Sequence, residues 1–127
     1  MTDTLGLLWS RKVTSANTSD QAGFRLAFVH TISFLVCVVN VFADRGYRGL
    51  EAWLISITGG HCVLQIVQAG AGQKGFAVQP KRWIVERTIS WLSWSRRLSK
   101  DYEQTSMSSE AWIDVSAIRW TLRKLVR

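Results

Sequence analysis

Short hydrophobic blocks, separated by polar or glycine-containing stretches, run through the first half of the chain. Runs rich in β-branched and aromatic residues predict strands, and apolar residues that recur every three or four positions predict helices. The patterns predict a strand at residues 5–9, a helix at 23–33, a strand at 34–43, a helix at 50–57 and a strand at 61–68. Residues 34–43 form the strongest predicted strand, because they are dense in β-branched and aromatic side chains. Glycines 59 and 60 are expected to end the second helix.

Two longer amphipathic patterns fill the second half, at residues 81–98 and 109–126. On the first predicted helix, one face carries Ile84, Thr88, Trp91 and Leu92; on the second, an apolar stripe consists of Ala111, Val115, Ile118, Leu122 and Leu125. Such stripes are typical of helices that pack on a core. Ser108 or Ser109 is expected to cap the second helix, with Glu110 in its first turn, where the helix dipole favours an acid.

The order of these elements predicts an α/β fold. The sequence alternates strands and helices up to residue 68 and then continues into the two long helices. At 127 residues the chain fits a single domain. We expect a sheet region at residues 1–79, followed by C-terminal helices at 80–127, with glycine-rich residues 69–75 as a loop and Pro80 at a helix entry.

Composition narrows the class of protein. An apolar content of 47% with a single proline is not that of a disordered or collagen-like chain. Seven tryptophans indicate either a large aromatic core or a surface that meets a partner. The two cysteines are too few for a disulfide scaffold, and no basic stretch precedes an apolar run at the N-terminus. The cytoplasm is therefore the expected location.

One segment has the length of a membrane span. Residues 26–43 contain no Lys, Arg, Asp or Glu. However, the segment includes His30, Thr31, Ser33 and Asn40, and its second half resembles a buried strand. A short helix that leads into a strand is the favoured interpretation.

Charge is concentrated in the C-terminal half. Residues 1–73 carry five basic and four acidic side chains, whereas residues 74–127 carry eleven basic and five acidic ones. Tryptophan and arginine interleave at residues 91–100 and 118–127. Such a surface can neutralise phosphates and so indicates nucleic-acid binding, although a solvated helix face explains the charge equally well.

Three carboxylates stand out by their positions. Asp3 precedes the first predicted strand, Asp44 follows the strongest strand, and Glu86 lies within the first long helix. Carboxylates at strand ends can converge at one edge of an α/β sheet, and converging carboxylate oxygens suit magnesium. Taken singly, each has a common structural role: the aspartates as turn residues and the glutamate as a helix ion-pair partner.

Several stretches of the sequence resemble the DDE transposases of bacterial insertion sequences, of the insertion-sequence four/five-like group. The resemblance is carried by FADRGYRG at residues 42–49, the block at 80–104 that contains RWIVERT, the helix at 108–125 and DTLGLL at 3–8, followed by VTSANTSDQAG. It covers nearly the whole chain and is weakest at residues 24–41. Residues 82–88 are its most specific part.

The resemblance implies an RNase H-like mixed sheet with flanking helices, in which Asp3, Asp44 and Glu86 are the catalytic triad and bind Mg²⁺ or Mn²⁺. The partners it implies are the DNA of transposon ends and targets, and it leaves a homodimer and an upstream-frame product open as further partners. It implies a bacterial, cytoplasmic protein. The expected phosphate contacts are Arg82, Arg87, Arg96, Arg97 and Lys100. Trp91 and Trp94 are expected to be packing residues.

The chain departs from the family pattern in three ways. Gln79 stands where a tyrosine is common, and Ser93 stands where a basic residue follows the glutamate. The chain also begins two residues before Asp3, so we expect an N-terminally truncated catalytic core, inactive alone. Either a second reading frame or a decayed remnant would explain this.

Two other function classes remain open. One is a non-catalytic DNA-binding module that uses residues 81–127, and the other is a small membrane protein. Zinc binding is disfavoured, because His30, His61, Cys37 and Cys62 lack the paired spacing of structural zinc ligands.

Overall fold

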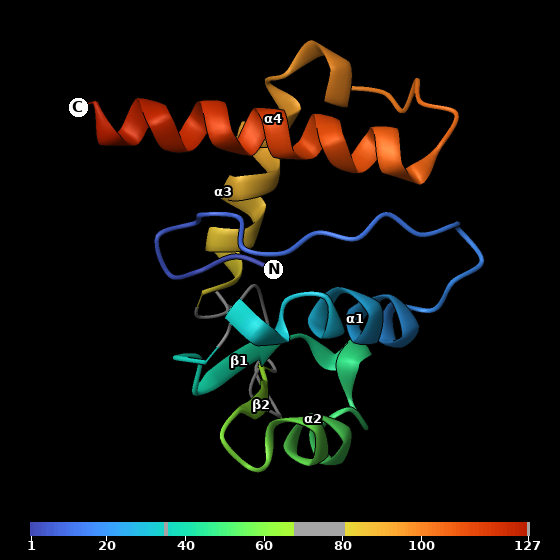
Figure 1. The fold of residues 1–127 in the computed structure, drawn as a ribbon, viewed down its shortest axis with the longest axis vertical. Coiled ribbons are helices and arrows are strands. Elements are labelled where there is room, and N and C mark those ends of the chain that lie inside the picture. The colour runs from blue at the N-terminus through green and yellow to red at the C-terminus, as the bar shows by residue number, and fades with distance from the viewer. Residues whose placement is uncertain (35, 68–80, 127) are drawn as a thin grey trace, which may run out of the picture. The chain divides into compact units, whose positions relative to one another are not determined.

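The computed structural model describes residues 1–34, 36–67 and 81–126. Contacts between residues divide the chain into two compact units (Figure 1). Unit 1 consists of Met1–Asn17 and Lys81–Arg127, and unit 2 consists of Thr18–Pro80. Both contain helices, and the two paired strands belong to unit 2. The expected α/β class is therefore confirmed as a mixture of helices with a small parallel sheet.

Unit 2 is built around two parallel strands. Its elements are α1 (Asp20–Val29), the 3₁₀ turn η1 (Ile32–Phe34), β1 (Asn40–Ala43), the 3₁₀ turn η2 (Arg45–Tyr47), α2 (Glu51–Thr58) and β2 (Val63–Ile66). The strands pair in register from Asn40 with Val63 to Ala43 with Ile66. Because the strands are parallel, the chain must cross over between them, and η2 and α2 form that crossover.

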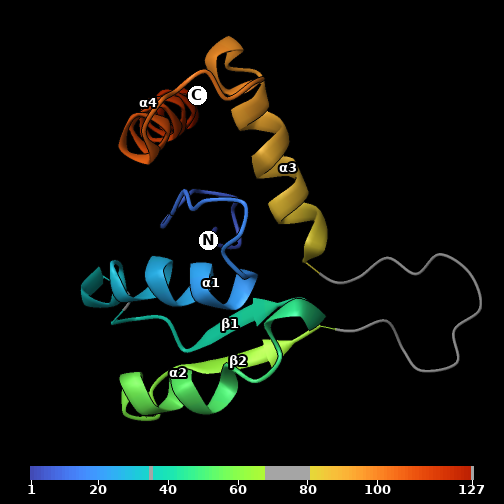
Figure 2. The same cartoon turned by 90° about the vertical axis from the view of Figure 1, so that its right-hand side faces the viewer.

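Aromatic rings join the helices of unit 2. Phe24 and Phe28 of α1 lie with their ring centroids 6.3 and 6.2 Å from the ring of Trp53 in α2. Figure 2 shows α1 beside β1 and α2 beside β2. Leu54 of α2 and Leu64 of β2 are buried. Helix α2 ends as expected at Gly59, whose left-handed backbone closes the last turn.

Both strands of unit 2 are shorter than the sequence predicts. The apolar run at residues 34–43 contributes only its last four residues to β1, because β2 offers only four partners. Val36 and Cys37, which the pattern places in the strand, are exposed. The described part of residues 26–43 forms the end of α1, η1 and β1. Within residues 1–34, 36–67 and 81–126, no helix is both long and apolar enough to cross a bilayer.

Unit 1 combines an N-terminal segment with two helices. Its elements are α3 (Arg82–Ser93), the 3₁₀ turn η3 (Arg96–Leu98) and α4 (Ser106–Leu125), and Figure 1 shows α4 running across α3. Ile84 and Thr88 of α3 are buried, and the rings of Trp91 and Trp120 pack with centroids 4.1 Å apart. The face of α3 that packs is therefore the one that the sequence predicts, which carries Ile84, Thr88 and Trp91.

Residues 5–9 do not form the predicted strand, because the chain turns at Thr4 and Leu5. The N-terminal segment folds back on itself, with one antiparallel bridge between Thr2 and Leu8. The carboxylate of Asp3 accepts hydrogen bonds from the backbone of Leu5 and Leu7, and Gly6 has a positive φ of 83°. The local hydrogen bonds of the aspartate thus replace those of a strand ladder.

The two long helices differ from the predicted bounds at specific residues. The expected helix at 81–98 breaks after α3, because Ser95 is extended and η3 starts a new turn. The expected cap of α4 at Ser108 or Ser109 is wrong. Thr105 is the cap, since its extended backbone lets its hydroxyl accept the backbone N–H of Ser108. Glu110 consequently lies beyond the first turn.

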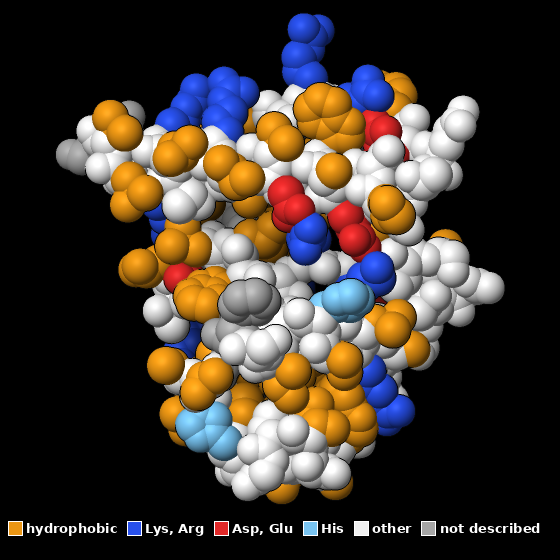
Figure 3. Space-filling model, viewed as in Figure 1, with side chains coloured by type: hydrophobic (Ala, Val, Ile, Leu, Met, Phe, Trp, Pro, Cys, Tyr) orange, Lys and Arg blue, Asp and Glu red, His pale blue; other side chains and the backbone are white. Residues whose placement is uncertain are grey.

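The apolar stripe predicted along α4 lies at the surface. Its members Val115, Ile118, Leu122 and Leu125 are between 55% and 76% exposed. Figure 3 shows hydrophobic side chains at the surface over α4. The helix instead packs through the neighbouring face, which carries Trp120 and Thr121. Helical periodicity therefore identifies the helix, but it does not identify the side of the helix that unit 1 buries.

Candidate functional site

Asp3 lies at the base of the N-terminal turn. Its Oδ1 atom accepts the N–H groups of Leu5 and Leu7, both at 2.8 Å, and its Oδ2 accepts the indole N–H of Trp9 at 3.2 Å. The backbone of the turn is closed by a hydrogen bond of 3.0 Å from Asp3 N to Leu7 O. The carboxylate is therefore held in one orientation by three donors.

Helix α3 and helix α4 hold this turn from outside. Thr88 donates its hydroxyl to Gly6 O at 2.9 Å, and both Arg87 and Lys124 donate to Leu5 O at 3.0 Å. A Cβ atom on Gly6 would stand 3.0 Å from Thr88 Oγ1 and 3.1 Å from an Arg87 nitrogen. The turn thus touches the helix at the two residues that directly follow Glu86.

Glu86 lies on the exposed side of α3. Its carboxylate accepts a hydrogen bond of 2.9 Å from Arg82, one helical turn earlier. The side chains of both residues are more than 60% exposed. Water screens such a pair, so its stabilising effect is small, and Glu86 can exchange its partner at little cost.

Asp44 occupies the turn after β1 in unit 2. Its side chain caps η2 by accepting the N–H of Gly46 at 2.9 Å. Burial, followed by the negative charges of Asp20 and Asp44, raises the pKa of Tyr47 above its ordinary value. Asp44 is exposed, so one carboxylate oxygen holds the turn at a site that solutes can reach.

The three predicted carboxylates are divided between the two units. Asp3 and Glu86 belong to unit 1, whereas Asp44 belongs to unit 2. Across the described ranges, no three His, Cys, Asp or Glu side chains lie close enough together to hold a metal ion. As donors, three carboxylates have the chemistry that a hard divalent cation requires.

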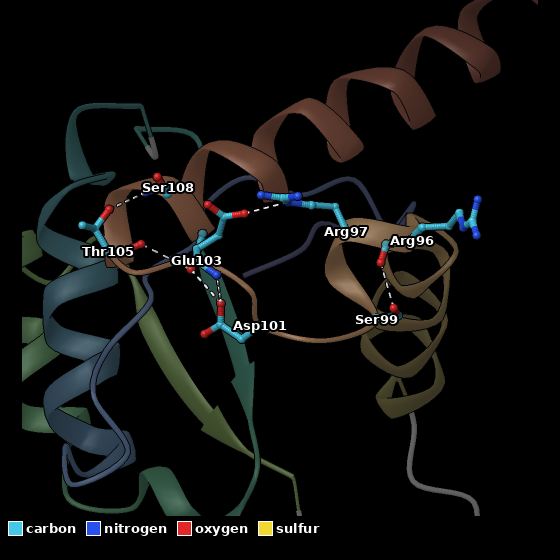
Figure 4. A network of polar contacts seen from close by, with 8 residues as sticks. Arg96, Arg97, Ser99, Asp101, Glu103, Thr105 and Ser108 are labelled. Atoms are coloured by element: carbon cyan, nitrogen blue, oxygen red, sulfur yellow. Dashed lines mark hydrogen bonds and ion pairs between the residues drawn. The ribbon is translucent and has the colours of Figure 1, made fainter.

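The predicted phosphate contacts fall into two kinds. Arg87 and Arg97 are engaged by protein groups: Arg87 by Leu5 O, and Arg97 by Glu103 at 2.7 Å and by the ring of Trp112 at 5.3 Å. Figure 4 shows Arg97 directed at Glu103 and Arg96 pointing away from that network. Arg96 and Lys100 are exposed, and their side chains have no hydrogen bond or ion pair to the described residues.

Two ion pairs join the N-terminal segment to α4, and the sequence analysis did not predict them. Arg11 pairs with Asp114, and Lys12 pairs with Glu110 at 2.9 Å. The backbone N–H of Val13 also donates to Glu110, and these contacts, led by Val13 and then Lys12, lower the pKa of Glu110 below its ordinary value. A signal was present: Glu110 and Asp114 are four residues apart and so share a helix face.

A groove of about 330 Å³ lies beside these ion pairs in unit 1. It is lined by Leu8, Trp9, Ser10, Arg11, Asp114, Ala117, Ile118, Thr121 and Leu122.

Trp94, expected to be a packing residue, is 74% exposed, whereas Trp91 packs as expected. Trp94 follows α3 directly and stands two residues before Arg96. The exposed tryptophan and arginine therefore occur together where α3 ends.

Comparison with known proteins gives one match. The family model described as the transposase DDE domain matches residues 1–120. No curated protein matches the chain, and no solved structure does. The matched range includes Asp3, Asp44 and Glu86, and it extends through most of α4.

Proposed function

Because the chain belongs to the family of the transposase DDE domain, we propose that it is the catalytic core of an insertion-sequence transposase of the four/five-like group. The observation that carries the proposal is the family match over residues 1–120, a range that contains Asp3, Asp44 and Glu86. The reaction is hydrolysis of a phosphodiester at a transposon end, followed by attack of the freed 3′-hydroxyl on target DNA. DNA is thus both substrate and partner.

We assign the metal-binding role to Asp3, Asp44 and Glu86, with Mg²⁺ or Mn²⁺ as the cofactor and an RNase H-like arrangement as the fold that brings them together. The donor chemistry supports this assignment, since all three are carboxylates. When bound, two such ions would activate water and stabilise the leaving oxygen of the phosphodiester. On the protein side, the hydrogen bonds of Asp3 and Asp44 to their own turns fix the carboxylates, which reduces the reorganisation needed to bind a cation.

The DNA backbone is expected to meet the basic side chains around the end of α3. Arg96 and Lys100 are the best supported of the predicted phosphate contacts, because both are exposed, and Arg96 points away from the ion pair of Arg97 with Glu103 (Figure 4). Arg82 can join them if Glu86 exchanges Arg82 for a cation. Arg97, held by Glu103, is better placed to shape η3 than to bind phosphate.

The test is a nicking assay on DNA that carries the terminal repeats, with magnesium or manganese, using the chain alone and with any upstream-frame product. We expect nicking to require the cation and to be lost in Asp44→Asn and Glu86→Gln. Asp20→Asn is the matched control, since Asp20 is an exposed acid of unit 2 outside the proposed triad. Nicking that survives both triad variants would overturn the assignment.

A second candidate function is a non-catalytic DNA-binding module. The observation that favours it is the charge of unit 1, which carries twelve basic and six acidic side chains. This function predicts DNA binding that persists in both triad variants and no nicking with any cation. The same assay therefore separates the two functions.

A further inference from the structure

The N-terminal turn that carries Asp3 is held by three side-chain donors from the helices of unit 1. Two of them, Arg87 of α3 and Lys124 of α4, converge on one acceptor, Leu5 O. The third, Thr88, is buried, and its hydroxyl lies 2.9 Å from the next carbonyl, Gly6 O, and 3.0 Å from Ile84 O of its own helix. Three donors on two consecutive carbonyls are more than a surface turn needs, because water can satisfy exposed carbonyls.

A stack of aromatic rings fixes the two cations. The Arg87 guanidinium carbon lies 4.4 Å from the ring centroid of Trp83 and 4.6 Å from that of Trp91. Lys124 Nζ lies 4.7 Å from the ring centroid of Trp91 and 5.7 Å from that of Trp120. Cation–π attraction at these distances favours the observed positions of both side chains. Both cations are thus held in place over the same indole before they reach Leu5 O.

The packing of Arg87 also argues against a role in binding phosphate. Its Nε atom is buried and lacks a hydrogen-bond partner among the described residues. A guanidinium that binds phosphate presents its nitrogen edge to solvent, where paired N–H groups can reach two oxygens. Arg87 instead uses its planar face on two rings and one nitrogen on a backbone carbonyl.

The carbonyl that Arg87 and Lys124 hold belongs to the same residue that binds Asp3. Leu5 donates its N–H to Asp3 Oδ1 at 2.8 Å and accepts both cations at its own oxygen. Leu5 therefore links the carboxylate of Asp3 to α3 at the residue after Glu86. The close fit of Gly6 against Thr88 leaves the turn little room to shift along the helix.

We propose that Arg87 and Lys124 are positioning residues, which act through Leu5 to hold Asp3 in a fixed place relative to the helix that carries Glu86. This inference rests on the proposed function, because it treats Asp3 and Glu86 as parts of one site. It also reassigns Arg87, which the sequence suggested as a phosphate contact. Thr88 supports the same turn through Gly6.

The experiment compares Arg87→Met with Arg96→Met in the full chain. Methionine keeps an unbranched side chain against the two tryptophans but removes the charge and the donor, and Arg96 provides an exposed arginine for comparison. Amide hydrogen exchange of the N-terminal peptide is the first readout. We expect exchange at residues 3–8 to rise about tenfold in Arg87→Met, as for the loss of one charge-assisted hydrogen bond, and to stay unchanged in Arg96→Met.

The second readout separates positioning from DNA contact. In the nicking assay, Arg87→Met should raise the manganese concentration for half-maximal rate about tenfold, as changes behind metal ligands do, with DNA affinity unchanged. Arg96→Met should instead weaken DNA binding and make the DNA affinity less dependent on salt, and it should leave the manganese requirement unchanged. The proposal is wrong if Arg87→Met changes DNA affinity, its salt dependence and the manganese requirement as Arg96→Met does, and leaves amide exchange at residues 3–8 unaltered.

Two further variants keep the test decisive if Arg87→Met folds poorly. Thr88→Val preserves shape but removes the hydrogen bond to Gly6 O, and Lys124→Met removes the second donor on Leu5 O. Both should increase exchange at residues 3–8, and Arg87→Lys should recover part of the protection. If no variant nicks DNA and neither does the unmodified chain, even with an upstream-frame product, the proposed function fails, while the exchange data still decide whether Arg87 positions the turn.

Discussion

At the scale of single residues, short polar side chains decide where the backbone turns. Asp3 and Asp44 each accept a backbone N–H two residues further along, which is the geometry of an Asx turn. The structural and the functional interpretations of these aspartates are therefore compatible. One carboxylate oxygen can hold the turn while another electron pair remains for a cation, as a carboxylate has about four acceptor positions.

Glu110 gives a pH-dependent prediction. It accepts the N–H of Val13 and the ammonium of Lys12, and its side chain is only 15% exposed. Because its pKa is lowered in the folded chain, its contribution to stability is complete above the ordinary glutamate value of about 4.3 and is lost as the pH falls through the lowered pKa. Glu110→Gln should lower the free energy of unfolding by about 1–2 kcal/mol at pH 7, measured by urea titration.

The difference between Glu110→Gln and the unmodified chain should shrink as the pH falls below about 4. Glu86→Gln is the control, since the pair with Arg82 is exposed and should change stability by less than about 0.5 kcal/mol. A difference that stays constant down to pH 2 would show that the charge of Glu110 does not contribute.

The two cysteines should differ in reactivity. Cys37 is exposed, whereas Cys62 is buried, and burial raises the pKa of the Cys62 thiol, so less thiolate forms. With an aromatic disulfide reagent at pH 8, we expect one thiol to react quickly and the second to react only as the chain unfolds. Cys37→Ser should abolish the fast phase. Two equally fast thiols would contradict the burial of Cys62.

At the scale of elements, helices were predicted better than strands. The signal for α2, α3 and α4 is local, since apolar spacing and a terminal glycine act within a few residues. A strand needs a partner, and β1 keeps only the residues that β2 can pair. The predicted strand at residues 5–9 failed for another reason: Asp3 offers the same backbone donors a closer acceptor.

The cap of α4 can be tested directly. Thr105→Ala removes the hydroxyl that accepts the Ser108 N–H and should lower the free energy of unfolding by about 1 kcal/mol. Ser108→Ala should be neutral or slightly stabilising, because Ser108 lies inside the helix, where alanine is favoured. Chemical denaturation followed by circular dichroism measures both. A larger loss of stability in Ser108→Ala than in Thr105→Ala would support Ser108 as the cap, as the sequence analysis predicts.

The exposed stripe on α4 gives a further prediction. Ile118→Gln with Leu122→Gln should change the free energy of unfolding by less than about 0.5 kcal/mol per site, because both side chains are more than half exposed. The same variant should bind less of an apolar fluorescent dye. Ile84→Gln, at a position that is 7% exposed, should cost about 3 kcal/mol. If the α4 variant costs as much as Ile84→Gln, the stripe is covered in solution.

At the scale of the whole molecule, the candidate site depends on contacts that no local pattern reveals. The residue types of the site were predictable, because carboxylates at turns and within a helix are visible in the sequence. Their surroundings were not. Leu5 O accepts a hydrogen bond from Lys124, which is 119 positions away along the chain. The backbone N–H of Val13 donates to Glu110, which is 97 positions away. Arg87 is likewise packed through a contact with Leu5 O, 82 positions away.

Charge is also partitioned at this scale, which leads to a test of where DNA binds. Unit 1 carries twelve basic and six acidic side chains, whereas unit 2 carries four and three. In a plot of log affinity against log salt concentration the slope is negative, and its magnitude falls by about 0.9 for each phosphate contact that is removed. We expect Arg96→Gln with Lys100→Gln to lower this magnitude by about 1.8, and Arg25→Gln with Arg45→Gln to leave it unchanged. Both pairs remove two charges, so an equal loss would mean that net charge, rather than the exposed basic residues beyond α3, governs binding.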